Sequence, residues 1–124
     1  MAAEVRLGDC LEVVRDLAAA TVDMVYVDPP FFTRKAHSLV TRDRTTRFEF
    51  SDEWKSREEY LGFMRVRLKE LRRVLKPTGS LFFHCDTNAS HHLRCLLDEV
   101  FGEAKFRSLP IPPAFRGLLA RDER

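Results

Sequence analysis

The sequence predicts an α/β fold in which helices flank a mostly parallel sheet. Short apolar segments rich in β-branched residues alternate with longer segments whose apolar residues recur every three or four positions. This is the strand–helix alternation of a parallel sheet. The 124 residues suffice for one domain, and contents of 44% apolar and 32% charged residues are ordinary for a globular protein.

The first strand, the first helix and the second strand are expected before residue 28. Residues 4–9 (EVRLGD) predict a short strand that ends in a Gly-Asp turn. Residues 10–20 predict a helix with apolar residues on one side: Leu11, Val14, Leu17 and Ala18. Residues 22–27 (VDMVYV) then predict a central strand that is buried on both faces, as in parallel sheets.

A long polar segment and a strong helix signal follow. Residues 33–55 predict a loop, within which 47–50 (RFEF) is a candidate short strand. Ser56 and Glu59 have the spacing of a capping box and predict a helix start. One apolar stripe follows: Tyr60, Met64, Leu68, Leu71 and Leu75. Pro77 and Gly79 are expected to stop the helix.

The last regular elements are expected before residue 108. Residues 80–86 (SLFFHCD) predict a second buried strand, and residues 88–102 predict a helix. The inward-facing residues of that helix would be Leu93, Leu96, Leu97 and Val100. Residues 1–107 therefore predict the folded domain, and residues 108–124 an irregular tail that contains prolines.

Three acidic residues follow or end the predicted strands. Asp9, Asp28 and Asp86 would all lie at the carboxyl ends of strands. In open parallel sheets, ligands bind beyond those ends. The three residues together therefore indicate a binding site at one rim of the sheet.

The tetrapeptide Asp28-Pro29-Pro30-Phe31 has the chemistry of an amine-binding site. The prolines stiffen the backbone and have no N–H, so their carbonyls and the Asp28 carboxylate are acceptors with few competing donors. Phe31 offers a flat face for stacking on a ring. An amino group on a planar ring is the exocyclic amine of a nucleobase, although a strand, a Pro-Pro turn and core phenylalanines would leave the same pattern.

The net charge of +2 conceals a basic middle of the chain. Residues 34–73 carry twelve Lys and Arg against seven acids, whereas residues 1–33 carry six acids against two Arg. A basic region favours an anionic polymer such as nucleic acid. A solvated helix face is the alternative explanation.

The three cysteines and the targeting signals are less informative. Cys10, Cys85 and Cys95 have no disulfide-framework or zinc-ribbon spacing, and no metal site is expected from them with the neighbouring His84 and His91. No apolar run reaches membrane-spanning length and no signal peptide opens the sequence, so we expect a cytoplasmic protein.

Two blocks of the sequence resemble one known family. Residues 7–31 (LGDCLEVVRDLAAATVDMVYVDPPF) and 71–86 (LRRVLKPTGSLFFHCD) resemble the DNA amino-methyltransferases that produce N6-methyladenine or N4-methylcytosine. The resemblance covers most of residues 5–107 in order, and it implies part of a Rossmann-like methyltransferase fold. The Asp form of the tetrapeptide is more typical of the adenine enzymes.

The resemblance also implies roles for individual residues. Asp28 and the Pro29 carbonyl would hold the target amine, Pro30 would shape the turn, and Phe31 would stack on the flipped base. Asp9 and Cys10 would lie beside the adenine end of the cofactor, S-adenosyl-L-methionine, although an Asp before a helix is also a common N-cap. Five basic residues would approach the phosphates of double-stranded DNA: Arg34, Lys35, Arg42, Arg44 and Arg47.

The sequence departs from the family in one respect. Members with an early Asp-Pro-Pro motif have a later Phe-x-Gly-x-Gly turn for the methionine part of the cofactor, and the five glycines here are not so spaced. We therefore expect the amino-terminal portion of a methyltransferase. It would be a truncated gene product, a fragment, or one part of a split enzyme in which a second polypeptide supplies this turn and the target-recognition region. A non-catalytic DNA-binding or dimerising remnant, and a receiver-type signalling domain, are the alternatives.

Overall fold

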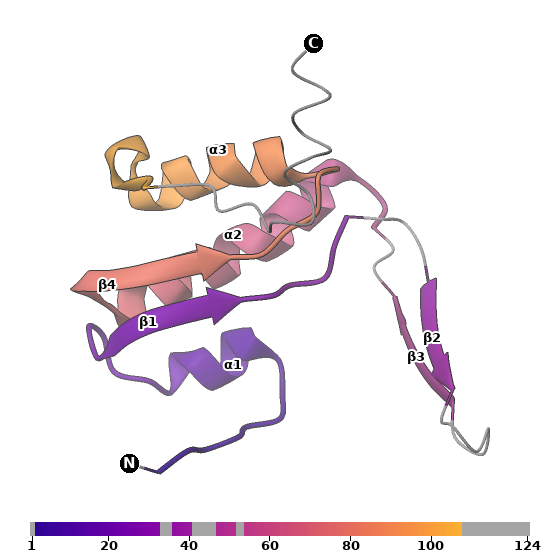
Figure 1. Cartoon of the computed structure of the whole chain (residues 1–124), viewed down its shortest axis with the longest axis horizontal. Coiled ribbons are helices and arrows are strands. Elements are labelled where there is room, and N and C mark those ends of the chain that lie inside the picture. The colour runs from indigo at the N-terminus through magenta and orange to yellow at the C-terminus, as the bar shows by residue number, and fades with distance from the viewer. Residues whose placement is uncertain (1, 33–35, 41–46, 52–53, 108–124) are drawn as a thin grey trace, which may run out of the picture.

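The computed structural model describes residues 2–32, 36–40, 47–51 and 54–107 (Figure 1). The elements follow in the order α1 (Cys10–Arg15), β1 (Val22–Val27), β2 (Ala36–Val40), β3 (Arg47–Ser51), α2 (Arg57–Val74), β4 (Leu75–Phe83), α3 (Ser90–Phe101) and a 3-10 turn (Glu103–Lys105). The predicted α/β class, with a parallel sheet flanked by helices, is confirmed. It corresponds to part of a Rossmann-like fold.

Strands β1 and β4 form a two-stranded parallel sheet. Met24 pairs with Ser80, and the register then continues to the last pair, Val27 with Phe83. Between the pair Val22–Leu75 and the pair Met24–Ser80 the register shifts, so residues 76–79 form an irregularity in β4. Because both strands end at the same register position, the residues that follow them lie at one rim of the sheet.

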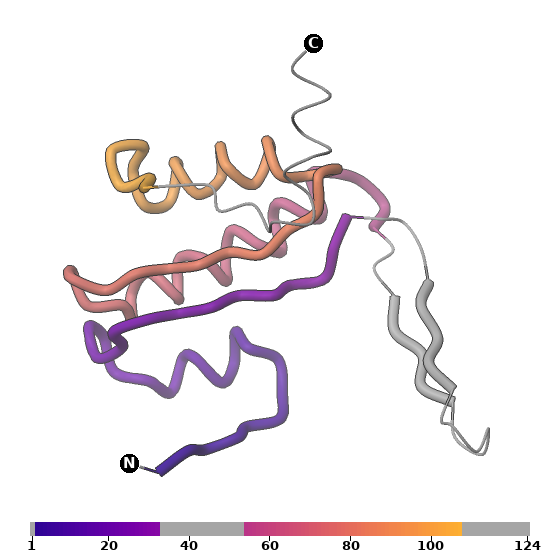
Figure 2. The backbone as a smooth tube through the Cα atoms, in the orientation of Figure 1, coloured from indigo at the N-terminus to yellow at the C-terminus, as the bar shows by residue number. Residues whose placement is uncertain are grey.

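The hydrophobic core lies between one face of the sheet and the helices. The stripe predicted on α2 is confirmed, since its residues are among the most buried of the chain: Tyr60, Met64, Leu68 and Leu71. From α3, Leu93, Leu96 and Val100 join this core. In Figures 1 and 2, α2 runs behind the two strands, with α1 and α3 on either side of it. Four residues of the strands pack against this helical layer and define the covered face: Val25, Val27, Leu81 and Phe83.

The start of α2 follows the prediction. Ser56 is the N-cap, and its hydroxyl accepts a hydrogen bond from the Glu59 N–H at 3.1 Å. The Glu59 carboxylate reaches back to the N–H of Lys55 at 2.8 Å, one residue earlier than in an ideal capping box. The end of the helix differs from the prediction, because β4 begins at Leu75 and Pro77 and Gly79 lie within the strand irregularity.

The strand predicted over residues 4–9 is wrong for this structure. These residues form no strand, and the side chains of Val5 and Leu7 are 97% and 103% exposed. A strand needs a neighbour for its backbone N–H and C=O groups, and no described strand lies beside this segment. The local sequence has strand character, but no partner is there to pair with it.

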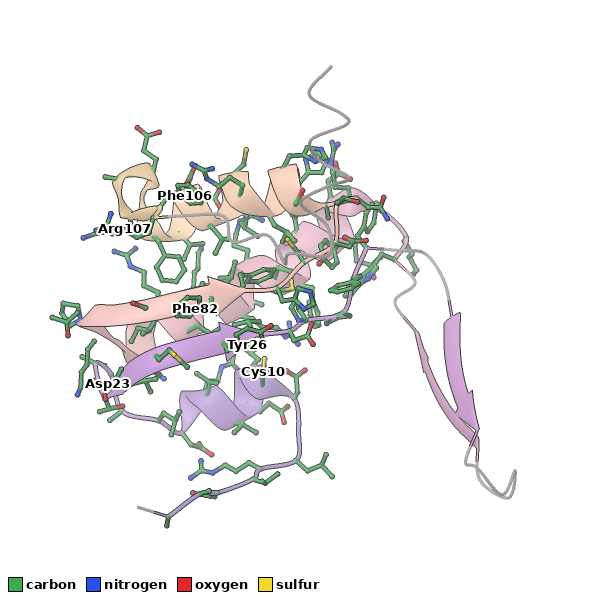
Figure 3. The ribbon with its side chains drawn as sticks, viewed as in Figure 1. Cys10, Asp23, Tyr26, Phe82, Phe106 and Arg107 are labelled. Atoms are coloured by element: carbon green, nitrogen blue, oxygen red, sulfur yellow. The ribbon has the colours of Figure 1, made fainter. Side chains whose placement is uncertain are left out.

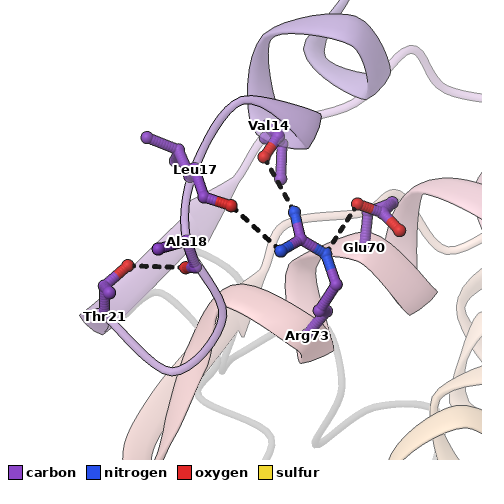
Figure 4. A network of polar contacts seen from close by, with 6 residues as sticks. All are labelled: Val14, Leu17, Ala18, Thr21, Glu70 and Arg73. Atoms are coloured by element: carbon purple, nitrogen blue, oxygen red, sulfur yellow. Dashed lines mark hydrogen bonds and ion pairs between the residues drawn. The ribbon is translucent and has the colours of Figure 1, made fainter.

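Helix α1 is shorter than predicted, ending at Arg15 and not near Ala20. Figure 4 shows the reason. The Arg73 guanidinium of α2 donates to the carbonyls of Leu17 at 2.9 Å and Val14 at 3.1 Å, and it is held by Glu70 at 3.0 Å. A side chain of another helix therefore donates to the Val14 carbonyl in the last turn of α1 and to the Leu17 carbonyl just after it, and the chain can turn toward β1.

The prediction that β1 is buried on both faces is wrong. Met24 and Tyr26 of β1 are 60% and 63% exposed, and Phe82 of β4 is 46% exposed. Tyr26 and Phe82 are register partners on neighbouring strands (Figure 3). We call the surface of Met24, Tyr26 and Phe82 the open face of the sheet.

The segment predicted as a loop contains a hairpin. Strands β2 and β3 pair antiparallel, from Ala36 with Ser51 to Val40 with Arg47. The short strand predicted at 47–50 is thus confirmed, whereas β2 was not predicted. The predicted tail, residues 108–124, lies outside the described residues.

Candidate functional site

The site lies at the carboxyl ends of β1 and β4, where Asp28–Phe32 and His84–Asp86 follow the two strands; we call these two segments the rim. The strands bring the segments together through the backbone, because the His84 N–H donates to the Val27 carbonyl at 2.8 Å. Asp28 and His84 each come directly after the last register pair of the sheet. Their side chains therefore leave the sheet at the same place.

The Asp28 carboxylate contacts one imidazole. Its Oδ1 lies 3.1 Å from Nδ1 of His84, and the two side chains are 61% and 52% exposed. An ionised carboxylate can only accept, so the imidazole donates in this contact. The remaining carboxylate oxygen has no hydrogen-bond partner among the described residues.

The turn after Asp28 is held by two aromatic side chains of the α2 region. The buried Tyr60 hydroxyl donates to the Pro30 carbonyl at 3.0 Å. The indole N–H of Trp54 donates to the Phe31 carbonyl at 3.3 Å. Among the described residues, no donor reaches the Pro29 carbonyl. The Pro30 and Phe31 carbonyls thus accept hydrogen bonds from within the chain, whereas the Pro29 carbonyl accepts none from the described residues.

Aromatic rings pack around this turn. The centroid of the Phe32 ring lies 5.4 Å from that of Tyr60, and the Trp54 ring lies 5.0 Å from Tyr60. The rings of Phe31 and His84 meet edge to face, with centroids 5.5 Å apart and an interplanar angle of 88°. Such contacts fix the backbone of the turn and the direction of the Phe31 ring.

The arrangement suits a ligand with an amino group on a flat ring. Asp28 and the Pro29 carbonyl are two neighbouring acceptors for two N–H bonds, and the half-buried Phe31 is an apolar surface beside them. The residues of the predicted amine site are consecutive in the chain, and the structure orders them around one turn at the rim.

Asp9 has a structural role that was predicted as an alternative. It is the N-cap of α1, and its Oδ1 accepts from the Leu11 N–H at 2.9 Å. Its Oδ2 accepts from the Arg67 guanidinium at 2.7 Å, which ties α1 to α2. Both partners lower the pKa of Asp9: the hydrogen bond from the Leu11 N–H is the first cause, and the Arg67 guanidinium adds to it.

Asp9 and Cys10 lie at the N-terminal end of α1. The segment that enters α1 is on the same side of the molecule as the ends of β1 and β4 (Figure 1). The Asp9 side chain is 47% exposed, and a carboxylate has about four lone-pair sites, of which two are used here. The Cys10 thiol is exposed.

Asp86, the third acid predicted at the strand ends, lies three residues beyond β4 and accepts from the Asn88 amide at 3.0 Å. Burial raises the pKa of the neighbouring Cys85 thiol. Within the part of the chain that the structure describes, no three His, Cys, Asp or Glu side chains gather where they could hold a metal ion.

The predicted DNA-contacting residues fall largely outside the described residues: Arg34, Lys35, Arg42 and Arg44. Arg47 is the first residue of β3, and only its backbone is described. Over the described ranges, no helix has the length and apolar character needed to cross a bilayer.

Sequence reasoning missed three contacts of the rim. His84 was considered only as a metal ligand, Tyr60 only as a core residue, and Trp54 only as part of a loop. The sequence did contain a signal for His84. Asp28 and His84 each follow one of two parallel strands, and residues that follow neighbouring parallel strands lie side by side. The bonds from Tyr60 and Trp54 depend on how α2 docks, and no local pattern reports that.

Comparisons with known proteins show the family of the chain. A family model described as "DNA methylase" matches residues 22–111, which include β1, the rim, α2, β4 and α3. The Mod subunit of the type III restriction-modification enzyme StyLTI of Salmonella typhimurium is 36% identical over 123 residues, covering 80% of this chain and 18% of that protein.

Two further relatives are type II methyltransferases. M.HinfI of Haemophilus influenzae is 37% identical over 81 residues, covering 60% of this chain and 22% of its own length. M.KpnI of Klebsiella pneumoniae is 30% identical over 103 residues, covering 81% of this chain and 24% of its own length. The chain thus spans roughly a fifth of the length of the curated relatives it matches.

Proposed function

The chain belongs to the DNA methylase family, and we propose that it carries the amine-binding part of an S-adenosyl-L-methionine-dependent DNA methyltransferase. The favoured target is N6 of adenine, with N4 of cytosine as the second choice. The observation that carries the proposal is the rim itself, where Asp28, with its carboxylate exposed, is followed by a Pro-Pro-Phe turn that Tyr60 and Trp54 hold in place. Family membership argues against the receiver-type alternative.

The proposed mechanism is electrostatic preorganisation. An exocyclic amine is a weak nucleophile because its lone pair is delocalised into the ring. Acceptors on both of its hydrogens, the Asp28 carboxylate and the Pro29 carbonyl, favour a more pyramidal nitrogen and stabilise the positive charge that develops on it. Phe31 would hold the base after it has left the duplex.

S-adenosyl-L-methionine supplies the methyl group from its sulfonium, so the amine nitrogen gains a methyl group and loses one proton. Asp9 has two unused lone-pair sites and could accept hydrogen bonds from the adenine end of this cofactor. Cys10 is the next residue in the chain. For the methionine end, the sequence has no Gly-rich turn of the family type. The fit is therefore partial, and a complete pocket needs residues from outside these 124.

The rest of the pocket would come from a second polypeptide segment that covers the open face. Parallel sheets are almost always covered on both faces, whereas Met24, Tyr26 and Phe82 are exposed here. Val5 and Leu7, on the unpaired segment with strand character, are also exposed. A segment that adds strands and helices on this side would remove both exposed surfaces and bring the Gly-rich turn to the rim. Double-stranded DNA is the proposed substrate, with Arg34, Lys35, Arg42, Arg44 and Arg47 at its phosphates.

Calorimetric titration of S-adenosyl-L-methionine into the folded chain tests the division of the pocket. We expect weak or absent binding by the chain alone. Stoichiometric binding would contradict the need for a second segment. Absence of binding would leave two functions, a half-enzyme or a non-catalytic DNA-binding or dimerising remnant.

The site is tested in an assembly that methylates adenine-containing DNA. Asp28→Ala should abolish methyl transfer while DNA binding stays nearly unchanged. Asp23→Ala is the matched control, because Asp23 is an exposed acid at the opposite end of β1, paired with Lys76 at 2.9 Å. Transfer that survives Asp28→Ala, or that is lost equally in Asp23→Ala, would overturn the assigned role.

A further inference from the structure

We infer that His84 is a positioning residue for the amine site, which it serves by fixing both the acceptor and the stacking ring of that site. The inference rests on the proposed function, since it concerns how Asp28 and Phe31 are oriented. The His84 imidazole makes two contacts, one with the Asp28 carboxylate at 3.1 Å and one with the Phe31 ring at a centroid distance of 5.5 Å.

The backbone places His84 before its side chain makes any contact. The His84 N–H donates to the carbonyl of Val27, the residue immediately before Asp28, at 2.8 Å. The parallel register ends with Val27 opposite Phe83, so Asp28 and His84 follow at equivalent positions. The sheet therefore keeps these two side chains adjacent.

The contact with Asp28 selects one orientation of the carboxylate. Because the carboxylate only accepts, Nδ1 of His84 must carry the hydrogen. Oδ1 is then engaged, and rotation about the Asp28 side-chain torsion would break this bond. The other oxygen has no hydrogen-bond partner among the described residues, so it is free to accept from an amine. A carboxylate that is oriented in advance needs no reorganisation when the nitrogen becomes positive.

The contact with Phe31 fixes the second half of the site. The imidazole meets the Phe31 ring at 88°, the edge-to-face geometry that aromatic pairs prefer. The same His84 ring therefore sets the relative placement of the hydrogen-bonding group and the stacking surface. A nucleobase contacts both at once, so their relative placement determines whether its amine is aligned.

Fold stability does not explain these contacts. The Asp28 and His84 side chains are 61% and 52% exposed, and exposed pairs of this kind contribute little to stability. Nor is His84 part of a three-residue metal cluster among the described residues. The contacts of His84 instead restrict the side chains of Asp28 and Phe31, the two residues that the proposed function assigns to the target amine and its base.

Three substitutions separate the two contacts. His84→Ala removes both. His84→Asn keeps a short N–H donor close to the position of Nδ1 but removes the aromatic ring. His84→Phe keeps the ring and removes the donor. His91→Ala is the control, because His91 is an exposed histidine of α3 outside the rim.

The first readout is the side-chain torsion of Asp28 in the full chain, from three-bond NMR couplings to its carboxyl carbon. We expect one rotamer in the wild type and in His84→Asn, and averaged couplings in His84→Ala and His84→Phe, with no change in His91→Ala. Averaged couplings in the wild type, or a single rotamer in His84→Ala, would overturn the inference. Thermal unfolding of each variant checks that it is folded.

The second readout is steady-state kinetics in an assembly that transfers methyl groups. His84→Ala should lower kcat by about 10- to 100-fold with KM for DNA nearly unchanged, since positioning is lost and DNA contacts are not. His84→Asn should recover part of kcat. If Asp28→Ala leaves transfer intact, the proposed function fails while the rotamer measurement still stands, so the two ideas fail separately.

Discussion

The two faces of the β1–β4 sheet differ although alternating residues of the same two strands form them. On the covered face, Val25 and Phe83 pack against α2 and α3. On the open face, the neighbouring positions Tyr26 and Phe82 are 63% and 46% exposed. Side chains alternate along a strand, so one apolar segment supplies both surfaces. Among the described residues, only one of these surfaces packs against other elements.

The covered face stabilises the chain, whereas the open face is where we propose that a further segment completes the function. The helical layer on the covered face accounts for the buried core, and it also supplies Tyr60 and Trp54, which hold the rim. The open face contributes little to the stability of the chain by itself. Met24, Tyr26 and Phe82 are three large apolar side chains on one exposed sheet surface, and larger contiguous apolar patches mark interaction sites.

The largest expected effect comes from a substitution on the covered side. Leu68 is 0% exposed at the centre of the α2 stripe. Leu68→Ala should lower the free energy of unfolding by about 2–5 kcal/mol, because it removes buried methyl groups and leaves a cavity. Tyr26→Ala on the open face should change it by less than about 0.5 kcal/mol. Urea unfolding of both variants measures the contrast, and equal losses would mean that the open face is covered in solution.

The irregularity in β4 allows a second contrast, between two glycines. A Cβ on Gly79 would lie 3.0 Å from the Asp23 carbonyl oxygen and 3.1 Å from that of Lys76, both backbone atoms. Gly79→Ala should therefore destabilise the chain by about 1–3 kcal/mol, as overpacking does. The substitution would disturb the backbone pairing between β1 and β4, and not the side chains of the open face.

Gly62 in α2 is the matched control, since a Cβ there would meet nothing within 4 Å. Gly62→Ala should stabilise the chain by about 0.5–1 kcal/mol, because alanine favours helix. Thermal and urea unfolding of both variants give the comparison. A neutral Gly79→Ala would mean that residues 76–79 rearrange easily.

A smaller effect is expected where the helical layer meets the rim. Tyr60→Phe keeps the buried ring and removes the hydroxyl that donates to the Pro30 carbonyl at 3.0 Å. The loss should be about 1 kcal/mol, the net value of a typical hydrogen bond. Tyr26→Phe, at an exposed tyrosine, should be neutral. Urea unfolding measures both, and a neutral Tyr60→Phe would show that this bond does not hold the turn.

The sequence predicted well what depends on local pattern. The α2 stripe, the Ser56 cap and the β1 segment followed from periodicity and capping residues. The placement of Asp28 at a strand end followed from the α/β alternation. These features are encoded over a few neighbouring residues, so reading them requires no knowledge of the tertiary structure.

What failed depends on which segments are neighbours in space. Residues 4–9 have strand character but no described partner, and the apolar pattern of β1 predicted burial on a face that no described residue covers. Arg73, which donates to the Val14 carbonyl of α1, lies 59 positions from Val14 in the sequence. Long-range contacts of this kind leave no local signal.

The smallest expected effect concerns Asp9, which joins α1 to the helical layer. Hydrogen bonds from the Leu11 N–H and from Arg67 lower the pKa of Asp9 below its usual value of 3.8. A lowered folded-state pKa means that the stabilising contribution is complete above the unfolded-state pKa and is lost as the pH falls through the lower folded-state value. The contribution should therefore be constant above about pH 5 and should decrease below about pH 4.

Asp9→Asn provides the measurement, because Asn is also a good N-cap but carries no charge toward Arg67. The difference in the free energy of unfolding between wild type and Asp9→Asn should be small and constant from about pH 5 to 7, and should shrink as the solution is acidified. Urea unfolding at several pH values follows it. A difference that does not change with pH would mean that the Arg67 and Leu11 contacts do not depend on the Asp9 charge. In that case α1 would be attached to α2 through Arg73 and not through its N-cap.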